Sequence, residues 1–210
     1  LISDSNNEFE QEIKLSEIKI VSDIISGTPD YLLKKVKKNL EYAVFDLFTE
    51  RTVIISGKSR YSVEYGMGTL DFLIPHKQLR KIMYSEDYID PAKFTGKVDL
   101  IGVSSSHEKK YLKEYVIINV DKFEVRGLTK GKRNYFKDFI SKIKVLDSKD
   151  EARQAISVFT KNLIESTEPV VDLFAINKEV EKEKVDEITK GMDVDKKEAV
   201  IEIARRFIFN

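Results

Sequence analysis

The spacing of apolar residues changes along this chain of 210 residues. Up to about residue 146, segments with apolar residues at every second position alternate with segments at the helical spacing of three and four. From residue 147 onward, mainly the helical spacing recurs. We therefore predict an α+β fold, with an antiparallel or mixed sheet in residues 1–146. A mainly helical C-terminal region, residues 147–210, would pack on this domain or on a partner.

The clearest predicted element is a long N-terminal helix from Thr28 to about Phe48. Thr28 is a suitable N-cap, and Pro29 suits the first helical position. The apolar stripe of this helix comprises Leu32, Leu33, Val36, Leu40, Ala43, Val44, Leu47 and Phe48. Lysines and Glu41 occupy the opposite face. We expect this helix to pack against the sheet.

Several short segments have the alternation or the β-branched content that is typical of strands. Residues 12–21 indicate either a strand with a bulge or a short hairpin. Further strands are predicted over 52–56, 60–65, 69–74, 98–103 and 115–128, the last a hairpin that turns near residue 121. Turns that contain glycine separate the first three of these. Residues 77–84 favour a short helix.

Four helices are predicted in the second half of the chain, over residues 135–145, 148–164, 178–190 and 195–209. Ser148 followed by Glu151 forms a capping box, in which each residue satisfies a backbone N–H group of the other. Asp195 with Glu198 is an acidic variant of the same motif. Opposite charges three residues apart stabilise the 178–190 helix at its surface.

Composition limits the chemistry that is available to the chain. It has no cysteine, no tryptophan and two histidines, whereas 34% of its residues are charged, with 36 of each sign. Disulfides, thiol nucleophiles, zinc–thiolate sites and multi-histidine metal centres are therefore excluded. Abundant Lys and Glu without Cys is a composition found in hyperthermophile proteins. The net charge of zero argues against a surface that is positive throughout.

Two glycine-containing segments have some features of phosphate-binding loops. Ser56-Gly57-Lys58-Ser59 has the ending of a P-loop, but this motif needs an earlier glycine, where Thr52 stands, and a helix that follows. The residues after Ser59 alternate as in a strand, which favours a β-turn. Gly66-Met67-Gly68 lacks the third glycine of a dinucleotide-binding loop. Both segments are predicted to connect strands.

Hydroxyl, imidazole and carboxylate groups gather in one segment, Ser104-Ser105-Ser106-His107-Glu108. Serine catalysis needs a base within hydrogen-bonding distance, and the nucleophile-elbow motif is absent, so a polar loop after a strand is favoured. Asp193-Val194-Asp195 lacks the glycine and the spaced acids of a calcium loop, and helix capping accounts for Asp195. We therefore predict no catalytic residue, no metal site and no cofactor.

The best candidate for a binding surface is the basic stretch 126–144, in which Asp138 is the one acidic residue. Lysine and arginine contact phosphates, and aromatic rings stack on bases. The predicted polyanion-binding residues are Arg126, Lys130, Lys132, Arg133, Tyr135 and Lys137.

The shortage of catalytic groups favours a non-catalytic, cytoplasmic module that binds a macromolecule, either a protein partner or a second copy of itself. The charged helical segment 178–208 and the stretch 126–144 are the expected binding regions. The first alternative is a nucleic-acid-associated protein that uses 126–144, and the second is a hydrolase-type enzyme whose site the sequence does not reveal. No membrane association is expected, because no apolar run approaches the ~18 residues that span a bilayer.

Overall fold

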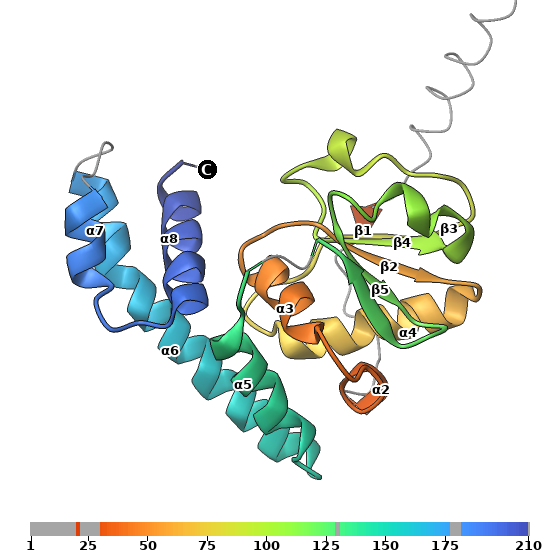
Figure 1. Ribbon diagram of the computed structural model, residues 1–210, viewed down its shortest axis with the longest axis horizontal. Coiled ribbons are helices and arrows are strands. Elements are labelled where there is room, and N and C mark those ends of the chain that lie inside the picture. The colour runs from red at the N-terminus through yellow and green to blue at the C-terminus, as the bar shows by residue number, and fades with distance from the viewer. Residues whose placement is uncertain (1–19, 22–29, 129–130, 177–181, 210) are drawn as a thin grey trace, which may run out of the picture.

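A mixed sheet of six strands lies in the first part of the chain (Figure 1). The computed structural model describes residues 20–21, 30–128, 131–176 and 182–209. The strands are β1 (Ile20–Val21), β2 (Val53–Gly57), β3 (Lys81–Ser85), β4 (Leu100–Ser104), β5 (Val116–Asn119) and β6 (Glu124–Gly127), in the order β1-β3-β4-β2-β5-β6. The four inner strands are parallel, and β1 and β6 pair antiparallel at the edges. The predicted combination of a mixed sheet with helices is confirmed.

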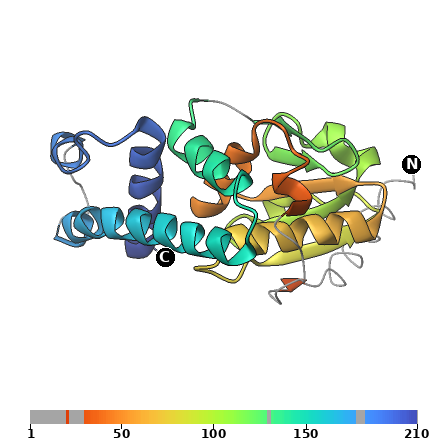
Figure 2. The same ribbon diagram turned by 90° about the horizontal axis from the view of Figure 1, so that it is seen from below.

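Helices cover one face of this sheet and form an arm beside it (Figure 2). Those beside the sheet are α2 (Asp30–Leu33), α3 (Leu40–Phe48) and α4 (Arg60–Leu73). The helical arm consists of α5 (Asn134–Lys144), α6 (Lys149–Ile176), α7 (Lys182–Ile188) and α8 (Val194–Phe209), with α7 and α8 packed along α6. The other face of the sheet is covered by connections that contain the 3-10 helices η1 (Pro91–Phe94) and η2 (Ser105–Lys110).

The prediction of one long N-terminal helix over 28–48 is wrong. The described part of this segment forms two short helices, α2 and α3, and the backbone between them turns at Asn39, whose φ of 70° is left-handed. Four lysines lie in the break, Lys34, Lys35, Lys37 and Lys38. A continuous helix would bring several of these like charges one turn apart, where they repel. In addition, the carbonyl of Val36 accepts a hydrogen bond of 2.7 Å from Lys144 Nζ of α5.

The strands predicted over 60–65 and 69–74 are also wrong, because these residues form the single helix α4. Its buried side chains include Val63, Met67 and Leu70, which have the helical spacing of four and three. Gly66 lies on the same buried face, where an added Cβ would come within 3.1 Å of Val120 Cγ1. This glycine allows close packing of a helix on the sheet and does not mark a turn. Residues 81–84 of the helix predicted over 77–84 belong to β3 instead.

Elements with clear local signals agree with their predictions. The predicted strands 52–56 and 98–103 correspond to β2 and β4, the predicted hairpin to β5 and β6, and the helix 135–145 to α5. Ser148 Oγ accepts the N–H groups of Asp150 and Glu151 at the start of α6, and α6 continues past Pro169 to Ile176, beyond the predicted end near 164. Residues 12–19 and 178–181 of two other predictions lie outside the described residues.

Asp195 has a different partner from the one that its sequence context predicts. It lies inside α8, next to the first residue, and is buried. Its carboxylate Oδ2 accepts the backbone N–H of Phe136 in the first turn of α5, at 3.2 Å. The N–H groups of a first helical turn have no partner within their own helix. Asp195 of α8 therefore caps α5.

Candidate ligand site at the carboxyl ends of the parallel strands

The chain leaves the neighbouring strands β2 and β4 toward opposite faces of the sheet. The two strands are parallel, and their pairing ends with Gly57 opposite Ser104. After Gly57 the chain enters α4, which packs on one face through Met67. After Ser104 it enters η2 and reaches Tyr111, which packs with Ile54 on the other face. In open α/β sheets, ligands bind outside the carboxyl ends of the strands at such a switch point. These two loops therefore form the candidate site.

The first loop, residues 56–59, joins β2 tightly to α4. Gly57 is required here, because an added Cβ would lie 2.6 Å from Val120 Cγ2. The backbone N–H of Lys58 donates to both carboxylate oxygens of Asp121, at 3.0 and 3.1 Å. Ser59 is the N-cap of α4, but its side chain makes no capping hydrogen bond. The N–H groups in the first turn of α4, at the positive end of the helix dipole, are therefore not capped by Ser59 and can bind an anion.

The β-turn between two strands that the sequence predicts for residues 56–59 is wrong. Strand β2 precedes this segment and helix α4 follows it, which is the context that phosphate-binding loops require. The earlier glycine of a full P-loop is still missing at Thr52. Lys58 and Ser59 are both exposed, so their side chains can reach a ligand. The loop has the geometry of an anion site without the complete motif.

The second loop, after β4, presents a cluster of hydroxyl groups. Ser104 Oγ accepts the N–H of Ser106 at 3.4 Å and the hydroxyl of Ser106 at 3.0 Å. His107 Nε2 lies 2.8 Å from the carbonyl oxygen of Glu86, on the loop after β3. No hydrogen bond joins His107 to a serine of this loop among the described residues. The expected polar loop after a strand is confirmed.

Glu108, in the same segment, has a buried side chain. Its Oε2 accepts hydrogen bonds from Ser56 Oγ at 3.3 Å and from Asn119 Nδ2 at 2.5 Å. Its Oε1 accepts one from Arg126 Nη1 at 3.5 Å. One carboxylate thereby joins the ends of β2 and β5 to η2 and β6. The sequence draws attention to Glu108 as part of a polar cluster, but these partners come from distant positions that only the fold brings together.

Two of the arginines predicted to bind a polyanion already contact carboxylates. Arg126 pairs with Glu124 at 2.5 Å, besides its bond to Glu108. Arg133 makes a two-pronged contact with Glu198 of α8 at 2.7 and 3.2 Å. Its guanidinium also lies over the ring of Phe45, 3.7 Å from the centroid. Arg133 therefore connects α8 to α3.

The other residues of that set have different surroundings. Tyr135 is half-buried, and its ring stacks on Phe159 with 4.9 Å between centroids. Lys132 and Lys137 are exposed near the start of α5. Lys130 lies outside the described residues. The structure thus separates Arg126 on β6 from the lysines near α5, and binding of a polyanion by this set stays a prediction.

Comparison with known proteins adds no assignment, since no family model and no curated protein matches the sequence. Within the described ranges, no three His, Cys, Asp or Glu side chains gather in a way that could hold a metal ion. No helix in the same part of the chain combines the length and the apolar character needed to cross a membrane.

Proposed function

We propose that this protein is a non-catalytic binding module whose loops after β2 and β4 hold a small phosphate monoester. The observation that carries the proposal is the position of residues 56–59, between a parallel strand and a helix and beside the serine loop after β4. The ammonium of Lys58, the N–H groups at the start of α4 and the nearby hydroxyls are the donors that phosphate oxygens accept.

Asp121 fixes the conformation of the first loop. Its carboxylate accepts the backbone N–H of Lys58, at 3.0 and 3.1 Å. The donors to phosphate are therefore the ammonium of Lys58 and the N–H groups in the first turn of α4, and not the N–H of Lys58. Glu108, in the segment after β4, joins this segment to the first loop through Ser56 and to β5 through Asn119. A site that is fixed in this way binds its ligand with little reorganisation.

The test replaces Lys58 with methionine and measures binding of phenyl phosphate and inorganic phosphate by titration calorimetry. Loss of one charge-assisted contact, worth about 1.5–3 kcal/mol, should weaken phenyl phosphate binding about 10- to 100-fold. Lys97→Met is the matched control, because this exposed lysine precedes β4 at the opposite end of the sheet and should leave the affinity unchanged. Equal affinities of wild type and Lys58→Met would contradict the proposal.

Nucleic-acid binding is a second candidate, favoured by the exposure of Lys132 and Lys137 close together in the chain. We expect Lys132→Glu with Lys137→Glu to weaken binding of single-stranded RNA and to lower its salt dependence by about one unit of slope per lysine. Arg133 is left intact, because its loss would also break the contact with Glu198. Filter binding at several salt concentrations measures the slope. Binding that is absent at every salt concentration would rule the candidate out.

A protein partner or self-association, expected from the sequence, also stays a proposal. Large apolar side chains that are mostly exposed on α6 and α8, among them Ile176 and Phe207, favour it. Light scattering at rising protein concentration tests self-association. If the mass rises, Ile176→Ser with Phe207→Ser should reduce it, and an unchanged mass curve would locate the contact elsewhere.

A further inference from the structure

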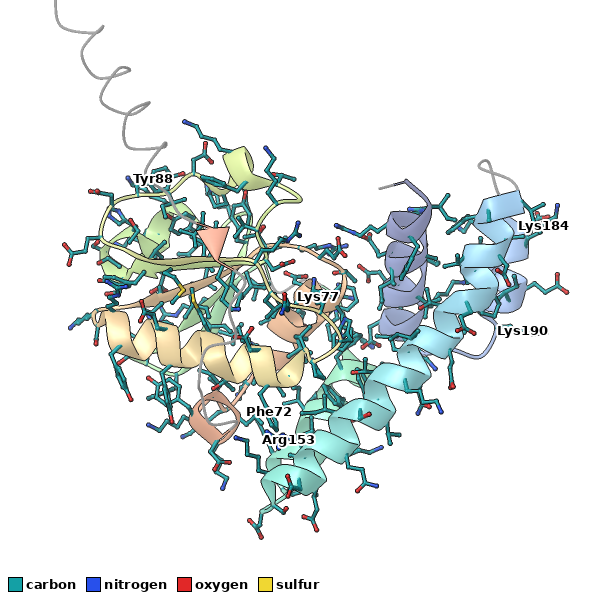
Figure 3. All side chains as sticks on the ribbon, turned by 180° about the vertical axis from the view of Figure 1, so that it is seen from behind. Phe72, Lys77, Tyr88, Arg153, Lys184 and Lys190 are labelled. Atoms are coloured by element: carbon teal, nitrogen blue, oxygen red, sulfur yellow. The ribbon has the colours of Figure 1, made fainter. Side chains whose placement is uncertain are left out.

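A cleft of about 680 Å³ lies between the C-terminal part of α4 with its following loop and residues 153–168 of α6. Figure 3 labels Phe72 and Arg153, which belong to its two walls. The candidate phosphate site lies at the other end of α4, about 20 Å away, because α4 has 14 residues at a rise of about 1.5 Å each. The cleft is therefore a separate place on the molecule.

The walls of the cleft are largely apolar. Phe72 and Pro75 line one side, and Ile156 and Ile164 line the other. Ile164 is 42% exposed, so part of its aliphatic side chain is accessible to a ligand. The volume lies in the range of roughly 300–1,000 Å³ that is common for small-molecule sites. The size and the walls suit a ligand with an apolar body.

Two polar groups in the lining have hydrogen-bonding capacity to spare. Thr160 is 6% exposed, and its buried Oγ1 has no hydrogen-bond partner among the described residues. A buried hydroxyl without a partner costs free energy, which a ligand group can recover. His76 keeps an exposed edge while its ring stacks on Phe48, with 4.7 Å between centroids. Burial of the ring and the charge of Lys77 lower the pKa of His76 to about 4, so its imidazole is neutral at pH 7.

Charges at the rim are mostly compensated by partners. Arg153 pairs with Asp150 at 3.5 Å, and Lys161 pairs with Glu165 at 3.7 Å. Asp71, on α4, pairs with Lys81. Glu168 adds an exposed carboxylate, which disfavours an anionic ligand. The lining therefore offers no net attraction for an anion, which would lose its hydration without compensation.

We propose that this cleft binds an uncharged small molecule with a compact apolar body and one hydrogen-bonding head group. The apolar body lies between Phe72 and the isoleucines of α6. The head group, an aromatic amine, alcohol or amide, reaches the hydroxyl of Thr160 or the imidazole of His76. This inference is independent of the phosphate site at the other end of α4.

The test compares two fluorescent probes that share one ring system. N-phenyl-1-naphthylamine is uncharged and has a single N–H donor, whereas 1-anilinonaphthalene-8-sulfonate carries an additional sulfonate. We expect saturable, one-to-one binding of the uncharged probe and binding of the sulfonate at least about tenfold weaker, because the cleft does not compensate its charge. Absence of saturable binding, or equal affinity for the two probes, would overturn the proposal.

Two variants of α6 locate the probe. Ser157→Phe places a ring in the cleft from an exposed position and should weaken binding of the uncharged probe about tenfold or more, because it creates a clash. Asp172→Phe adds the same ring at an exposed position of α6 outside the lining and should leave the affinity unchanged. Circular dichroism confirms that both variants fold. In the wild-type protein, the methyl resonances of Ile156 and Ile164 should shift with the probe, and unshifted methyl groups would also refute the assignment.

Discussion

Replacement of Asp71 by asparagine is expected to destabilise the protein by about 3–5 kcal/mol. Asp71 on α4 pairs with Lys81 Nζ on β3 at 2.8 Å, and the side chain of Lys81 is completely buried. The same ammonium donates to the carbonyl of Leu79 at 2.9 Å. The variant keeps the shape of the side chain but removes the charge that compensates a buried cation. Urea unfolding with linear extrapolation measures the loss of stability.

Two controls separate this effect from a general sensitivity of α4. The double variant Asp71→Leu with Lys81→Met removes both charges and should lose much less stability than Asp71→Asn, because apolar residues of similar volume replace buried pairs well. Glu64→Gln breaks a pair with Arg60 that is largely exposed on the same helix, and should cost at most about 1 kcal/mol. A loss below about 1 kcal/mol for Asp71→Asn would show that the pair is not needed.

The second large effect is a dependence of stability on pH through Asp46. Its side chain is 11% exposed between α3 and α8, with Arg51 Nη1 3.8 Å away. Burial raises the pKa of Asp46 to about 7, and the nearby Glu198 and Glu202 add to the rise, whereas Arg51 and Arg133 oppose it. The folded state therefore holds the proton more tightly than the unfolded chain, whose carboxyl has the ordinary pKa of 3.8. Stability falls as pH rises through this interval.

Asp46→Asn keeps the group neutral at every pH and should remove this dependence. The difference in free energy of unfolding between this variant and the wild type is expected to grow by about 2–3 kcal/mol, in favour of the variant, from pH 5 to pH 8. Urea unfolding of both proteins at the two pH values measures it. The control is Asp138→Asn, which changes an exposed carboxylate on α5. The free energy of unfolding of this variant should change with pH as that of the wild type does. Parallel curves for Asp46→Asn and the wild type would contradict the expected titration.

Local sequence signals were sufficient where an element depends on its own residues. Ser148 caps α6 as predicted, and the hairpin of β5 and β6 follows from its alternation and its turn. The failures lie where distant residues decide the conformation. The break after α2 is stabilised by Lys144, 108 positions from Val36. The sequence predicts a turn at Gly66, whereas in the structure this glycine packs closely on Val120, a contact that exists only once the sheet has assembled.

The candidate site could be predicted only in part for the same reason. Both of its loops attract attention in the sequence, but residues 56–59 lose their phosphate-binding context once a strand is assumed to follow them. Their proximity to the serine loop depends on the pairing of β2 with β4, which alternation within a strand does not reveal. The sequence likewise gives no sign that Arg133 has an ion-pair partner, because this partner, Glu198, lies 65 positions further on.

The cap that Asp195 provides to α5 also constrains the order of events during synthesis. The N–H of Phe136 leaves the ribosome 59 residues before the carboxylate that accepts it, a delay of several seconds at about 5–20 residues per second. During that interval the first turn of α5 lacks this capping bond. The strands β2 to β6 precede α5 in the chain, so they leave the ribosome before it, whereas this capping bond can form only after the start of α8 has emerged.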